Sequence, residues 1–109
     1  MNNTELLNYI ADKIKHELGK RNIPVLKLIL FGSRARGDER ADSDWDILAV
    51  TGRTVEWKEK REIWFELSSA LSEQGLSVDI MIKSDEEFSR DSSDKGKVSY
   101  YSCKEGVML

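Results

Sequence analysis

Five residues in the middle of the chain have the types and the spacing that phosphate and metal chemistry require. Gly32 and Ser33 follow an apolar run, and ten residues separate them from the pair Asp44 and Asp46, while Asp79 lies in a later apolar segment. Carboxylate oxygens are ligands that Mg²⁺ or Mn²⁺ prefers, and backbone amides freed at a glycine turn bind phosphate oxygens. The set predicts a site for a metal-bound phosphate, and the alternative is a solvated loop between two strands.

Three short apolar segments would have to position these carboxylates. They are rich in branched side chains and are predicted strands, over residues 25–31, 44–50 and 76–83. Because alternate side chains of a strand share a face, Asp44 and Asp46 point the same way, and Asp79 lies opposite its apolar neighbours. If the last two strands are adjacent, all three aspartates lie on the non-core face of one sheet, where they can bind one or two metal ions.

Helical periodicity predicts helices between and after these strands. Two long helices are expected over residues 4–19 and 55–73, and shorter ones over 85–90 and 94–105. The core-facing stripe of the second long helix is predicted to contain Trp57, Trp64, Leu67 and Leu71, with Ile63 and Ala70 beside it. The order of elements predicts one α/β (α+β) domain over residues 1–109, a small mixed sheet with helices packed on one face.

Composition narrows the class of protein. The net charge is −3, from 17 basic and 20 acidic residues, which disfavours binding of long nucleic acid. The single cysteine, Cys103, cannot form an internal disulfide and predicts a reducing, cytoplasmic location. No apolar run reaches the roughly 18 residues that a membrane span needs. The only histidine, His16, lies off its helix's apolar stripe and is expected to be solvated.

Two arginines follow the glycine turn and extend the predicted phosphate site. Arg34 and Arg36 can make charge-assisted, bidentate contacts to phosphate oxygens. The segment therefore contains both halves of a nucleoside-triphosphate site, one that binds phosphates and one that binds the bridging metal.

At this point the sequence resembles a known family. Gly32-Ser33, ten residues and Asp44-Trp45-Asp46 match the GS-x10-DxD signature of the nucleotidyltransferase superfamily that includes polymerase β and the aminoglycoside nucleotidyltransferases. The segment LFGSRARGDERADSDWDILAV is especially similar to the minimal nucleotidyltransferases (MNT), and Asp79 falls where that family carries its third carboxylate. The resemblance covers residues 25–83.

The resemblance implies a nucleotidyltransferase fold and Mg²⁺-dependent transfer of a nucleoside monophosphate, with ATP as the expected substrate. By that analogy Gly32 and Ser33 hold the triphosphate, and Asp44 and Asp46 bind the metals. Asp79 helps to bind the second metal and favours loss of the acceptor's proton.

The resemblance also implies a protein partner. MNT proteins of this size resemble antitoxins of two-gene modules whose other half is a helical HEPN toxin, which the antitoxin neutralises by attaching AMP to a tyrosine. The alternatives are a binding antitoxin without catalysis and transfer to a small molecule, the latter disfavoured because no acceptor domain follows the signature. Phe65, off the predicted core stripe, is a candidate contact for the toxin or for a second copy in a homo-oligomer, and one of Tyr100 and Tyr101 is another.

Overall fold

The computed structural model describes residues 2–93 and 106–109 and contains one four-stranded sheet. The elements in chain order are α1 (Asn3–Lys20), β1 (Val25–Phe31), α2 (Ser33–Arg36), β2 (Trp45–Thr51), α3 (Trp57–Ser72), β3 (Val78–Ser84), α4 (Asp85–Asp91) and β4 (Val107–Met108). The strand order is β3-β2-β1-β4, in which β2 and β3 run parallel and the other two pairs run antiparallel. Helix α3 provides the crossover that the parallel pair requires.

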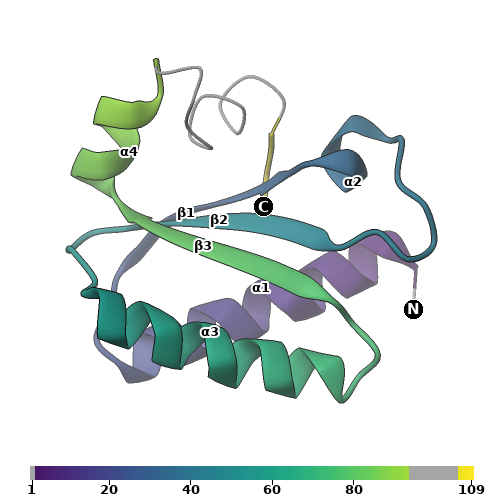
Figure 1. Cartoon of the computed structure of the whole chain (residues 1–109), viewed down its shortest axis with the longest axis horizontal. Helices are drawn as coiled ribbons and strands as arrows, with labels where there is room; N and C mark the ends of the chain where they lie inside the picture. Colours follow the sequence, from purple (N-terminus) through teal and green to yellow (C-terminus); the bar gives the residue numbers. More distant parts are fainter. Residues whose placement is uncertain (1, 94–105) are drawn as a thin grey trace.

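Helices α1 and α3 lie side by side on one face of the sheet (Figure 1). The main core fills the space between these helices and the strands, and it includes the fully buried Ile10, Ile14, Ile47, Ile63 and Leu71. The predicted mixed sheet with long helices on one face is confirmed. The short helix predicted over 85–90 is also present, as α4, but it lies on the other face, where Phe88 packs against a smaller cluster containing Ile29, Leu48 and Val50.

The predicted strands agree closely with the observed ones. The first matches residue for residue, and the other two differ by one or two residues at their ends. Helix α1 begins with a capping box, in which Asn2 Oδ1 accepts from the Glu5 amide at 2.9 Å. The predicted helix over 94–105, and with it Tyr100, Tyr101 and Cys103, lies outside the described residues.

The predicted core stripe of α3 is partly wrong. Leu67 and Leu71 are buried as expected, but Trp57 and Trp64 are 72% and 48% exposed. Ile63, which was placed at the flank, is fully buried instead. The sequence carries two apolar stripes along this helix, and the branched aliphatic stripe, not the aromatic one, packs against the strands. Phe65 is 64% exposed, as predicted.

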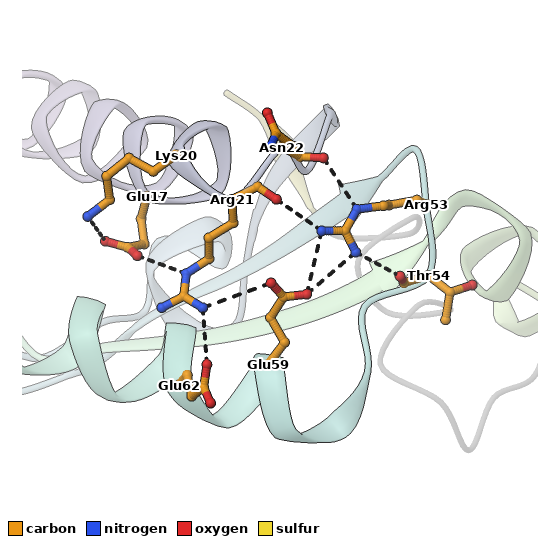
Figure 2. A network of polar contacts seen from close by, with 8 residues as sticks. All are labelled: Glu17, Lys20, Arg21, Asn22, Arg53, Thr54, Glu59 and Glu62. Carbon is orange, nitrogen blue, oxygen red and sulfur yellow. Dashed lines mark hydrogen bonds and ion pairs between the residues drawn. The ribbon is translucent and has the colours of Figure 1, made fainter.

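A network of charges ties the C-terminal end of α1 to α3 and to the turn after β2 (Figure 2). Glu17, only 8% exposed, accepts from Arg21 at 3.0 Å and pairs with Lys20 at 3.1 Å. Arg21 reaches across to Glu62 at 3.3 Å, and Glu59 joins Arg21 to Arg53. The network therefore connects the end of α1 to the turn after β2 and the start of α3, which are more than 30 residues away in sequence. In the part of the chain that the structure describes, no helix has the length and the apolar character to cross a membrane.

Candidate active site

The turn after β1 brings backbone close to a carboxylate. Gly32 has φ +76°, a left-handed conformation that favours glycine. A Cβ placed on Gly32 would lie 2.2 Å from Oδ2 of Asp46, so any side chain there would displace that carboxylate. Short helix α2 begins at Ser33, and Gly37 closes it with φ +82°. The glycine predicted to approach a ligand is thus also the residue that makes room for Asp46.

The predicted carboxylates meet on one face of the sheet. Asp46 of β2 lies directly opposite Asp79 of the parallel strand β3, and opposite Phe31 of β1 on its other side. Asp44 precedes β2 by one residue, and its Oδ1 accepts a hydrogen bond from the Ser77 hydroxyl at 2.5 Å. Trp45 and Ile47 point into the core on the opposite face, as the alternation predicts. The three aspartates therefore share the face that α1 and α3 do not cover.

The electrostatics of Asp46 reflect this crowding. Burial raises the pKa of its carboxyl group, and the nearby charges of Asp79 and Asp44 raise it further. The charge of Arg36 opposes these effects and lowers the pKa in part. A cation between the carboxylates would remove the repulsion that disfavours their ionised forms.

The donor set fits a hard divalent metal such as Mg²⁺. Asp46 and Asp79 lie on adjoining strands, and Asp44 directly precedes β2. All three carboxylates offer oxygen ligands, which this class of ion prefers. As the side chains stand, no three acidic, histidine or cysteine residues among those described converge on a common point. Asp44 accepts a hydrogen bond from Ser77, and it would exchange that hydroxyl for the metal on binding.

Arg34 lies in a different environment from the one that the sequence predicts. Its Nε donates to the carbonyl of Ser43 at 2.9 Å, and its Nη2 lies 3.4 Å from the carbonyl of Ala41. The guanidinium also stacks on the ring of Trp45, 4.1 Å from its centre. These contacts fix the loop that leads from α2 to β2, and with it the position of Asp44.

Arg36, by contrast, is close enough to Asp46 to affect its pKa. Its Nε forms an ion pair with Asp38 at 3.3 Å, and its side chain is 46% exposed. Ser33 is half-buried at the first position of α2, where helix amides have no partner within the helix. The structure therefore brings Gly32, Ser33 and Arg36 to the carboxylates, and turns Arg34 toward the loop.

Sequence reasoning missed Ser77. This residue donates to Asp44, and its carbonyl accepts from the Trp45 amide at 2.9 Å, so it aligns the start of β2 with β3. Its only signal in the sequence was its position two residues before Asp79. The parallel register of β2 and β3 places that position next to Asp44. That register cannot be read from either strand alone.

The profile of the family described as "Polymerase beta, Nucleotidyltransferase" matches residues 12–104, most of the chain. No curated protein sequence matches this chain significantly.

Solved structures with the same fold include chains of toxin–antitoxin complexes. One, a toxin–antitoxin complex with AMP-PNP, is 26% identical, has a TM-score of 0.61, and is matched over 89% of this chain and 69% of that chain. A complex of tri-AMPylated Shewanella oneidensis HEPN toxin with MNT antitoxin is 20% identical, with a TM-score of 0.57 and coverage of 93% and 66%. A protein assigned as a minimal nucleotidyltransferase is 22% identical, with a TM-score of 0.62 and coverage of 96% and 94%.

Proposed function

Because the chain belongs to the polymerase β nucleotidyltransferase family, we propose that it transfers AMP from ATP to a hydroxyl group of a partner protein, releasing pyrophosphate. The observation that carries the proposal is the placement of Asp46 opposite Asp79, beside Gly32 and within two residues of Asp44. The ionised form of Asp46 is costly in this arrangement without a function, since burial and the charges of Asp79 and Asp44 disfavour it.

In this reaction the acceptor's hydroxyl oxygen attacks the α-phosphorus of ATP. The new P–O bond forms as the bond between the α-phosphorus and the bridging oxygen breaks, and pyrophosphate leaves with that electron pair. Asp79, exposed at the edge of the sheet, receives the hydroxyl proton. Arg36 and the amides at the start of α2 bind the phosphate oxygens and stabilise charge on the leaving group.

Asp44, Asp46 and Asp79 would hold the divalent metal. When bound, Mg²⁺ supplies electrostatic stabilisation of the phosphoryl oxygens and acidifies the attacking hydroxyl. Gly32 keeps the Asp46 carboxylate in place because it offers no side chain at that contact. Arg34 acts indirectly, because it fixes the loop that carries Asp44.

A helical HEPN-type toxin is the proposed acceptor, and the protein then acts as its antitoxin. The support is the resemblance of the segment around Gly32 to MNT antitoxins, together with the similarity to a chain of a toxin–antitoxin complex with AMP-PNP. ATP is proposed as the nucleotide for the same reason.

The test is an AMP-transfer assay with the purified product of the neighbouring gene, ATP and Mg²⁺, read by intact mass. The wild type is expected to add AMP to the partner, and Asp44→Asn with Asp46→Asn should reduce the rate at least about 100-fold, because transition-state charge loses its main stabilisation. Asp42→Asn is the matched control, since Asp42 is an exposed carboxylate of the same loop. Absence of any mass gain with the wild type would refute the transferase proposal.

A second candidate is an antitoxin that occludes its toxin without catalysis. One observation favours it: Asp44 is hydrogen-bonded to Ser77 rather than turned toward Asp46 and Asp79. The double variant Asp44→Asn, Asp46→Asn separates the two functions in cells. If that variant still neutralises the toxin, catalysis is dispensable.

A further inference from the structure

A groove of about 1040 Å³ runs along the edge of the sheet formed by β3, and apart from Asp79 its lining residues have no part in the chemistry derived so far. One wall is β3, which among the described strands has a neighbour only on its β2 side. Consecutive residues from Asp79 to Lys83 line the groove, although their side chains alternate between the two faces of the sheet. This is expected where a ligand-sized space lies against the edge of a strand rather than over one face.

The other wall is the outer face of α3. Trp57, Arg61, Trp64 and Phe65, which we call the outer stripe, recur at helical spacing, line the groove, and are exposed. Three large aromatic side chains with 72%, 48% and 64% exposure form a concentration of apolar surface that an isolated protein rarely presents. Aromatic residues of this kind dominate the energy of protein interfaces.

The groove is continuous with the proposed catalytic site. Asp79 lines the groove and, through its register with Asp46, also belongs to the carboxylate set. An acceptor bound in the groove would therefore approach the residue that is to receive its proton. At the other end, Lys58 and Arg61 line the groove together with Glu62, and neither basic side chain forms an ion pair with a described residue, so both are available to an acidic group.

We propose that this groove binds an extended segment of the acceptor protein, which adds a strand to the edge of β3 and places its acceptor hydroxyl at Asp79. The inference rests on the proposed transfer function and names the part of the molecule that selects its substrate. The backbone groups on the free edge of β3 supply hydrogen bonds, and the outer stripe supplies apolar contacts to alternate side chains. An acidic residue of the segment lies against Lys58 and Arg61.

A second copy of the chain is the competing occupant. A symmetric pair of β3 strands would put the edge beside Asp79 inside the interface. It would leave an acceptor no path along the groove to that carboxylate. The continuity of the groove with Asp79 therefore favours the acceptor segment.

Transfer kinetics with the full chain and the acceptor protein of the assay above test the inference. Trp57→Ala and Phe65→Asp are expected to raise the KM for the acceptor protein at least about 10-fold, because truncation of a central aromatic anchor removes a large share of binding energy. Affinity for ATP should stay within about two-fold of the wild type. Leu26→Asp is the matched control, since Leu26 is 53% exposed and does not line the groove.

Hydrogen exchange of the same proteins adds a direct readout, since binding of an edge strand should slow exchange of β3 amides when the acceptor is added. Circular dichroism identifies a misfolded Phe65→Asp protein, and Phe65→Ala then replaces it.

If the wild type transfers AMP and the outer-stripe variants keep its KM, the groove proposal is wrong while the function stands. If the wild type neither binds ATP nor transfers AMP, the proposed function itself fails. A dimer of the wild type that Phe65→Asp converts to a monomer assigns the groove to a second copy and overturns the proposal.

Discussion

At the scale of single residues, Gly32 has two independent reasons to be glycine. Its φ of +76° strains any other residue, and its Cα faces Oδ2 of Asp46 with no space for a methyl group. Gly75 shares the first property, with φ +74°, but a Cβ there would meet nothing within 4 Å. The two glycines therefore separate backbone strain from the fit against a carboxylate.

Gly32→Ala is expected to lower the rate of AMP transfer about 100-fold, since displacement of a metal-binding carboxylate by about 1 Å has effects of that size. Gly75→Ala should leave the rate unchanged. Gly75→Ala should lose about 1 kcal/mol of unfolding free energy through its positive φ, and Gly32→Ala should lose more, because its Cβ also meets Oδ2 of Asp46; urea denaturation measures both losses. Equal transfer rates in the two variants would mean that Asp46 does not need its observed position.

At the scale of elements, the loop between α2 and β2 has its own anchor in Arg34. This side chain stacks on Trp45 and donates from its Nε and Nη2 to the carbonyl groups of Ser43 and Ala41. The sequence predicted a phosphate contact instead, because arginine beside a glycine turn has the chemistry for both roles. Only the folded loop brings those carbonyl groups within reach.

Arg34→Met is therefore expected to lower kcat about 10-fold or more and to leave the affinity for ATP within about two-fold of the wild type. Arg36→Met, in contrast, should weaken ATP binding about 10-fold, because it removes a charge-assisted contact to phosphate. Isothermal titration with a non-hydrolysable ATP analogue and steady-state kinetics measure the two quantities. A large loss of ATP affinity in Arg34→Met would show instead that Arg34 contacts the phosphates of ATP, as the sequence predicted.

The elements themselves show where prediction from sequence succeeds and where it stops. Strand β1 was predictable because Pro24 and Gly32 end it on both sides, and the aspartates because alternation fixes their face. The orientation of α3 was not predictable, because Trp57 and Trp64 share a helical spacing with Leu71, which is buried. Periodicity finds apolar stripes, but the shape of the sheet decides which stripe is covered, and here Ile63 packs closely where a tryptophan ring was expected.

At the scale of the whole molecule, the charge network around Arg21 joins α1, α3 and the turn after β2 (Figure 2). Its least exposed member is Glu17. Burial alone would raise the pKa of the Glu17 carboxyl, but hydrogen bonds and charges from Arg21 and Lys20 outweigh burial and lower the pKa below the ordinary 4.5. The ionised form is thus favoured by folding, and it contributes stability that is present above about pH 4.5 and is lost as the pH falls through the folded pKa.

Glu17→Gln should consequently lose about 1–2 kcal/mol of unfolding free energy at pH 7, since charge-assisted hydrogen bonds become neutral ones in a nearly buried position. The difference from the wild type should shrink below pH 4.5, where the native carboxyl group gains its proton, and urea denaturation from pH 7 to pH 3 measures it. Glu66→Gln, an exposed change on α3, should stay within about 0.5 kcal/mol throughout. A deficit in Glu17→Gln that remains constant down to pH 3 would show that Glu17 acts through its shape and packing rather than through its charge, and that the network holds the two helices together without electrostatics.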